Sequence, residues 1–141
     1  MHEWYFADFE VGQKFASDHD VTAESVAVYN RLNGYQSAIY VDPVAARTAG
    51  FDRLPVPPFY ATTYQFIASV PGIKLPQGGF YAKQSFRVLG PCFVGDRLHT
   101  EITVQDKYER RGRLYIAFDS ETVNQDGQPV MWGRRTRSWP S

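Results

Sequence analysis

The chain has 141 residues, 43% of them hydrophobic, and its fifteen basic side chains balance its fifteen acidic ones. This length predicts one domain, residues 1–141, with one buried core. Without a basic excess, neither nucleic acid nor an anionic membrane is the expected partner. No apolar run reaches the length that spans a bilayer. The acidic start of the chain is unlike a targeting peptide, and the single cysteine, Cys92, excludes an internal disulfide, so we expect a cytoplasmic protein.

The first half of the chain predicts short helices joined by loops. Residues Phe9–Phe15 are typical of a turn followed by a short strand. Thr22 is a suitable N-cap for a helix that ends at Asn33-Gly34, and its expected apolar stripe is Val26, Tyr29 and Leu32. Asp42-Pro43 predicts a second helix start, because Asp caps well and Pro suits the first helical position. That short helix is expected over residues 44–48.

A proline-stiffened loop then leads into an apolar and aromatic segment. Residues Phe59–Val70 predict a long buried helix that Pro71-Gly72 ends. A helix that is apolar on nearly all sides is expected to be surrounded by other structure.

The second half predicts four strands, at Gly79–Leu89, Arg97–Tyr108, Arg113–Asn124 and Val130–Trp139. Apolar and polar side chains alternate along them, which is typical of an antiparallel sheet with one buried face. Asp126-Gly127 is a strong hairpin signal. The residues therefore predict an α+β fold in which one helix packs against an antiparallel sheet.

The stretch Phe9–Leu98 resembles the MaoC-like family of (R)-specific enoyl-CoA hydratases and 3-hydroxyacyl-thioester dehydratases. The resembling pieces occur in the family's order and are Phe9-Glu-Val-Gly-Gln, Val41-Asp42-Pro43, Gly50-Phe51, Leu75-Pro76, Ser85-Phe86 and Gly90-Pro91-Cys92-Phe93-Val94-Gly95-Asp96. The resemblance implies a single hotdog fold, in which a long central helix is wrapped by a curled antiparallel sheet of about five strands.

The resemblance also locates the catalytic positions, and this chain departs from the family at them. The family carries Asp-x-Asn-Pro-hydrophobic-His before a hydrophobic-Asp-Pro step, and here Tyr35 and Tyr40 stand at the Asp and His positions. The glycine that offers its N–H to the thioester oxygen corresponds to Pro58, which has no N–H. A tyrosine hydroxyl ordinarily has a pKa near 10, unsuited to a general base at neutral pH. The acid, the base and the oxyanion donor are therefore all replaced.

Three functions are compatible with these residues. The leading hypothesis is a non-catalytic or diverged subunit of a dehydratase or hydratase system in fatty acid or polyketide metabolism. It would bind an acyl thioester, on coenzyme A or a carrier protein, without a further cofactor or metal. The second is an active lyase with rebuilt chemistry, in which Tyr35 or Tyr40 acts as the acid. The third is an acyl-binding module without chemistry.

The resemblance implies a site and a partner for this subunit. The residues expected to contact the acyl group are Ser37, Pro58, Phe59, Tyr60 and Tyr64. A lone hotdog sheet leaves an edge strand free, so we expect a homodimer or a heterodimer with a subunit that carries the Asp and His.

Several other residues carry simpler expectations. Cys92 is expected to be structural and buried, and Asp42 to cap a helix. The three histidines, His2, His19 and His99, are too dispersed for a metal site. The charged runs Arg134-Arg135-x-Arg137 and Glu109-Arg110-Arg111 are expected at solvated sheet edges; contact with coenzyme A phosphates is the alternative.

Overall fold

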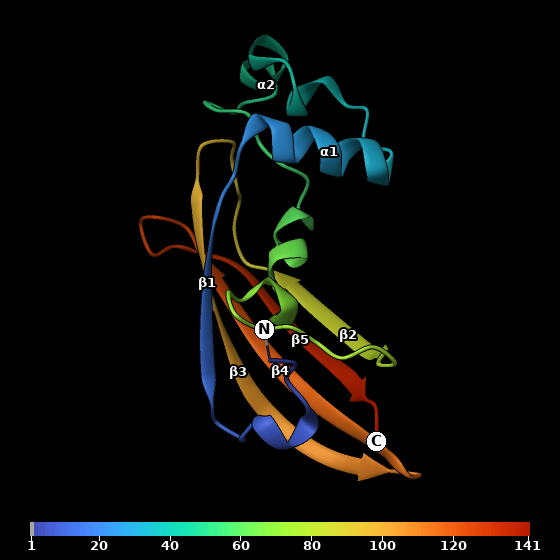
Figure 1. Cartoon of the computed structure of the whole chain (residues 1–141). Coiled ribbons are helices and arrows are strands. Elements are labelled where there is room, and N and C mark those ends of the chain that lie inside the picture. Colours follow the sequence, from blue (N-terminus) through green and yellow to red (C-terminus); the bar gives the residue numbers. More distant parts are fainter. Residues whose placement is uncertain (1) are drawn as a thin grey trace.

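Five antiparallel strands form one curled sheet in the computed structural model, which describes residues 2–141. The strands are β1 (Lys14–Asp20), β2 (Tyr81–Val88), β3 (Arg97–Arg110), β4 (Arg113–Val123) and β5 (Pro129–Trp139). They lie in the order β1-β3-β4-β5-β2, so β1 and β2 are the two edges (Figure 1). The α+β class, the four predicted strands and the curled five-stranded sheet are confirmed.

Two hairpin turns connect the long strands. The predicted turn at Asp126-Gly127 is present, with Gly127 at φ 74°. Between β3 and β4, Arg111 and Gly112 form a two-residue turn with φ values of 51° and 76°. Positive φ at both positions matches the twist of the flanking strands. Arginine is an unusual residue in this conformation, because its Cβ crowds the backbone there.

The helices α1 (Ala23–Asn33) and α2 (Pro43–Thr48) stand beyond one end of the sheet, with the 3-10 turn η2 (Ala38–Tyr40) between them (Figure 1). We call residues 22–53 the overhang. Thr22 caps α1 by accepting the Ser25 N–H at 3.0 Å, and Gly34 ends the helix at φ 74°, as predicted. The predicted apolar stripe is buried only in part, since Val26 is 2% exposed and Leu32 is 77% exposed.

The predicted helix over residues 59–70 is wrong. This central segment forms two 3-10 turns, η3 (Tyr60–Tyr64) and η4 (Ile67–Ser69), separated by extended backbone at Phe66 (Figure 1). The Thr62 hydroxyl donates to the Phe59 carbonyl at 2.7 Å, and the Thr62 carbonyl accepts from both Gln65 N–H and Arg135 Nη1. These local and tertiary bonds compete with the helical pattern.

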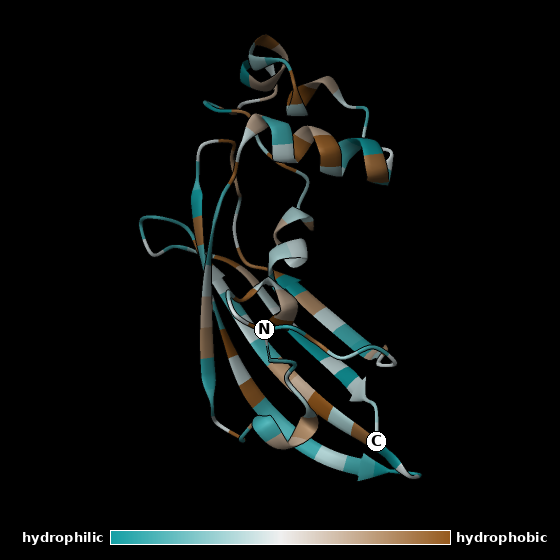
Figure 2. Cartoon of the chain, viewed as in Figure 1, coloured by the Kyte–Doolittle hydropathy of each residue, from teal (hydrophilic) through white to brown (hydrophobic). Residues whose placement is uncertain are grey.

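Two clusters of buried side chains fill the space between the sheet and the segments that cover it. One contains Phe9, Ile67, Val70, Ile73, Ile102, Val104, Ile116, Phe118 and Trp139, and the other contains Val21, Val26, Val56, Tyr60, Ala61, Cys92, Leu98, Val130 and Met131. Apolar and polar residues alternate along the strands, as Figure 2 shows. A fourth 3-10 turn, η1 (Phe6–Asp8), lies near the N-terminus. Among residues 2–141, no helix has the length and apolar character needed to cross a membrane.

Candidate functional site

The overhang brings Tyr35 and Tyr40 together. Their ring centroids are 5.9 Å apart and the rings are nearly perpendicular. Tyr35 follows the C-cap of α1, where its N–H donates to the Asn30 carbonyl, and Tyr40 ends η2. Neither hydroxyl has a hydrogen-bond partner among residues 2–141. The two positions of the family's acid and base are thus adjacent, but no described side chain orients or activates either hydroxyl.

Tyr40 and Pro58 line a mainly apolar cavity of about 200 Å³ under the overhang. Its other walls are Ile39, Phe51, Pro55, Val56, Val88, Gly90, Pro91 and Cys92. Cys92 is 7% exposed, and burial raises the pKa of its thiol to about 12. The thiol therefore stays protonated and is not a nucleophile at neutral pH. The prediction that Cys92 is structural and buried is confirmed.

The start of the central segment has few free N–H groups. Pro57 and Pro58 have none, and the Tyr60 N–H donates to the Pro57 carbonyl at 3.0 Å. The first amide hydrogen of the segment is therefore that of Phe59, one residue beyond the position that the resemblance assigns to the oxyanion donor.

The other residues predicted to contact an acyl group are dispersed. Tyr60 is fully buried and Tyr64 is half-buried beside it, with their ring centroids 5.3 Å apart. Phe59 is 47% exposed and lies edge-on to Phe86 on β2. Ser37 is exposed and does not line the cavity. Only Tyr40 and Pro58 of the predicted set share the cavity.

A histidine that the sequence did not single out lies in this region. His19, on β1, places Nε2 2.6 Å from the Tyr60 hydroxyl, and Ser25 Oγ lies 2.7 Å from the same hydroxyl. The His19 ring stacks on Tyr64 at 3.4 Å. Burial lowers the pKa of His19 and raises that of Tyr60, so both side chains are neutral at pH 7. His19 comes from β1, does not line the cavity, and has its Nε2 bonded to the Tyr60 hydroxyl.

Other polar side chains of this region have structural roles or unpaired atoms. Asp42 caps α2 by accepting the Val44 N–H at 2.9 Å, as predicted. Asn30, 5% exposed, has no hydrogen-bond partner for either amide atom among the described residues. Within residues 2–141, no three His, Cys, Asp or Glu side chains form a group that could hold a metal ion.

The charged run on β5 is not a solvated edge, and that prediction is wrong for two of its three arginines. Arg135 and Arg137 are each 6% exposed, whereas Arg134 is exposed and pairs with Asp119. Arg135 lies between the rings of Phe66, at 3.5 Å, and Phe86, at 4.8 Å. Its Nε donates to the Gln84 side chain at 2.8 Å.

Neither buried arginine has an acidic partner among the described residues. Arg137 donates to the main-chain carbonyls of Pro76 and Ser138 and stacks on Trp139. Burial lowers the pKa of Arg135 to about 10 and also lowers that of Arg137. Both guanidinium groups remain charged at neutral pH and are held by aromatic rings and neutral acceptors.

Comparison with known proteins agrees with this fold. A family model described as "FAS1-like, dehydratase domain region" matches residues 10–132. A UPF0336 protein of Saccharopolyspora erythraea is 27% identical over 124 residues, which cover 84% of this chain and 80% of that protein. A UPF0336 protein of Streptomyces avermitilis is 24% identical and covers 80% of this chain and 79% of its own length.

Solved structures of proteins named as hydratases or dehydratases superpose on nearly the whole chain. (R)-hydratase PhaJ1 from Pseudomonas aeruginosa has a TM-score of 0.84 at 22% identity, covering 97% of this chain and 86% of that one. The (R)-hydratase from A. caviae has a TM-score of 0.73 at 25% identity, covering 94% and 98%. The HadBC (3R-hydroxyacyl-ACP dehydratase) complex from Mycobacterium tuberculosis gives 0.73 at 21% identity, covering 91% and 96%. By sequence match and by fold, this chain belongs to the FAS1-like dehydratase-domain family and is a MaoC-like hotdog protein.

Proposed function

We propose that the chain is a non-catalytic subunit of a 3-hydroxyacyl-thioester dehydratase or enoyl-thioester hydratase. It binds an acyl thioester, carried by coenzyme A or a carrier protein, and pairs with a second hotdog subunit that supplies the Asp and His. The observation that carries the proposal is Pro58, which lacks the N–H that the resemblance assigns to this position. With a single, buried cysteine, the chain suits the reducing cytoplasm.

The replaced residues cover three separate contributions to catalysis. Positioned acid/base groups typically contribute about 10²–10⁴ to the rate. Loss of one oxyanion donor costs roughly 10²–10³ in kcat. Tyr35 and Tyr40 lack any described partner that would make either hydroxyl a working acid or base. The combined loss is large enough to abolish useful hydration.

The cavity supports a role in binding. Its walls are mostly apolar, which suits an acyl chain, and Tyr40 adds a hydroxyl at one side. At about 200 Å³ it is smaller than usual ligand pockets of about 300 Å³ or more. A second subunit that extends these walls would enlarge it.

The free edge of the sheet supports pairing through β2. Large apolar side chains are exposed along β2 and beside it: Phe59 47%, Phe80 45%, Val88 43% and Leu89 47%. The opposite edge, β1, has no exposed large apolar side chain. Exposed large apolar side chains at both ends of one sheet edge are the kind of surface that another chain would cover.

Native mass spectrometry of the purified protein tests the proposal. We expect an acyl thioester or a hotdog subunit with an Asp-x-Asn-Pro-x-His motif to copurify. A protein that carries no acyl ligand, and that shows no complex with such a subunit when the two are mixed, would contradict it. An acyl ligand bound without any complex would support the acyl-binding module instead.

A second candidate function is an active lyase with tyrosine chemistry, and the 5.9 Å approach of Tyr35 and Tyr40 favours it. In that case Tyr35→Phe or Tyr40→Phe would reduce turnover at least about a hundredfold. Full activity in both variants would exclude this function.

A further inference from the structure

Acidic and basic residues are segregated along the chain. All fifteen acidic residues lie within residues 1–52 and 96–126. Residues 53–95 and 127–141 contain seven basic residues and no acidic one. These acid-free stretches include the central segment, β2 and β5, which form the half of the sheet that ends at the free edge β2. The chain as a whole has no net charge, but residues 53–95 and 127–141 are basic.

Two cations on β2 are free of acidic partners. Lys83 and Arg87 are both exposed, and neither forms an ion pair with any residue of the described chain. Arg87 lies over the Trp132 ring at 5.8 Å, on the face of the sheet where Arg134 contacts the same ring. The buried Arg135 and Arg137 of the neighbouring strand add positive charge without adding an acid.

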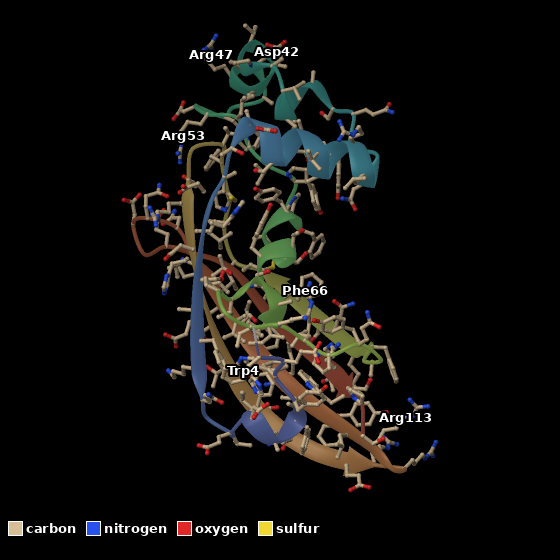
Figure 3. The ribbon with its side chains drawn as sticks, in the orientation of Figure 1. Trp4, Asp42, Arg47, Arg53, Phe66 and Arg113 are labelled. Atoms are coloured by element: carbon tan, nitrogen blue, oxygen red, sulfur yellow. The ribbon has the colours of Figure 1, made fainter. Side chains whose placement is uncertain are left out.

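The start of β2 is the most basic part of this edge. Lys83 and three arginines, Arg110, Arg111 and Arg113, line a groove of about 340 Å³ together with Tyr108 and Tyr115. Figure 3 shows Arg47 on the overhang and Arg113 at the opposite end of the molecule, at the far end of the sheet. Exposed cations therefore extend from Arg87 along β2 to the tip of the β3–β4 hairpin.

Pairing of β2 with the same strand of a second copy would bring these cations together. In such a symmetric pair the two-fold axis is perpendicular to the sheet, so the same face of each sheet points to the same side of the joined sheet. The side chains of Lys83 and Arg87 from both copies would therefore project from one face. The two-fold axis can pass through any position of the strand from residue 83 to residue 87, and each position gives a different antiparallel register. In each of these registers, a cation of one copy lies directly opposite or diagonal to a cation of the other copy. Like charges at such positions destabilise a strand pair. The carboxylates on the same face, Asp119 and Glu121, lie on β4, two strands away from β2, and Asp119 is paired with Arg134.

We infer that β2 pairs with a different subunit whose edge strand presents carboxylates to Lys83 and Arg87, and that these cations suppress pairing between two copies of this chain. The exposed apolar side chains beside β2 supply the contact area, and the charges select the partner. This inference rests on the proposed function for its choice of β2 as the pairing edge, and it identifies the partner as an acidic, heterotypic one.

A charge-reversal experiment tests the inference without knowledge of the natural partner. The double variant Lys83→Glu/Arg87→Glu is mixed with the wild-type chain, and native mass spectrometry and sedimentation at low salt report the species formed. We expect the wild-type chain alone to be monomeric and the mixture to form a hybrid dimer. The hybrid should be at least about tenfold tighter than self-association of either chain, and it should weaken as salt screens the pairs.

Two further variants complete the design. Arg31→Glu/Arg47→Glu changes the net charge equally but lies on the exposed overhang, so it should form no hybrid with the wild-type chain. Lys83→Gln/Arg87→Gln removes the charges without reversing them, and it should self-associate more readily than the wild-type chain. It also provides a readout if the reversed variant does not fold.

The inference is overturned if the wild-type chain forms a stable homodimer at low salt, or if neither β2 variant changes association. These measurements need no substrate and no turnover. They are therefore separate from the tests of the proposed function, which use ligand binding, activity and complex formation with a subunit that carries the Asp and His.

Discussion

The Tyr60 hydroxyl lies 2.6 Å from Nε2 of His19, and this contact joins the central segment to the edge strand β1. Ser25 Oγ, 2.7 Å from the same hydroxyl, joins both to the start of α1. The hydroxyl of buried Tyr60 thus joins β1 and the start of α1 to the central segment, which lies 35 to 41 residues further along the chain. Because Tyr60 is fully buried, its hydroxyl would be costly without these partners.

Tyr60→Phe should destabilise the protein by about 1–3 kcal/mol, because it leaves His19 and Ser25 without their shared partner. The measurement is urea denaturation with an unchanged m-value. Tyr115→Phe is the matched control, since Tyr115 is half-buried and its hydroxyl makes no hydrogen bond within the described chain; it should change stability by less than about 0.5 kcal/mol. Equal effects of the two variants would refute a structural role for the His19–Tyr60 contact.

His19 predicts a loss of stability at mildly acidic pH. Burial lowers its pKa in the folded protein, and the neighbouring Asp20 only partly opposes this shift. The unfolded chain, with a histidine pKa near 6.5, then binds a proton that the folded chain does not. The unfolding free energy should therefore be constant above about pH 6.5 and fall as the pH drops towards the lowered pKa of His19.

Urea denaturation at several pH values between about 7.5 and 5.5 measures this dependence around the histidine pKa. His19→Gln should flatten it, whereas His99→Gln, on the exposed part of β3, should not. An unchanged pH dependence in His19→Gln would show that other groups cause the loss.

Arg135 should contribute through packing more than through its charge. Arg135→Ala removes a side chain held between two aromatic rings and should cost about 2–4 kcal/mol. Arg135→Met keeps most of the volume and removes an uncompensated buried cation, so it should cost less than about 1 kcal/mol. If both variants lose the same stability, the hydrogen bonds to Gln84 and Thr62 outweigh the packing.

Arg111 occupies a backbone conformation that favours Asn or Gly. Arg111→Asn should therefore raise the unfolding free energy by about 0.5–1 kcal/mol, seen as a higher thermal midpoint. Arg110→Asn is the control, because Arg110 directly precedes the turn and does not have a positive φ. A lower midpoint in Arg111→Asn would mean that the Arg111 side chain makes contacts that outweigh the strain.

Local sequence signals predicted the strands and most helix boundaries. Alternation of apolar residues located β3, β4 and β5 within one or two residues of their ends. The caps at Thr22 and Asp42 depend on side-chain bonds within two or three residues of the cap, and for that reason the sequence alone could identify them.

Tertiary contacts decided the features that sequence reasoning missed. The central segment forms 3-10 turns, and its Thr62 carbonyl accepts from Arg135, a residue 73 positions away, a contact that no local pattern predicts. Arg135 and Arg137 share strand parity with the buried Met131 and Trp139, so alternation could have placed them inside. His19 likewise alternates with Phe15 on the inner side of β1, but its bond to Tyr60 required the fold.

The proposed function requires that this chain lacks hydration chemistry of its own. The most direct measurement is hydration of crotonyl-CoA by the pure wild-type chain, compared with its Tyr35→Phe/Tyr40→Phe variant. We expect both to show only background turnover, and turnover to appear when a subunit with the Asp and His is added. Turnover by the wild-type chain alone that falls at least about a hundredfold in the double variant would contradict the proposed function.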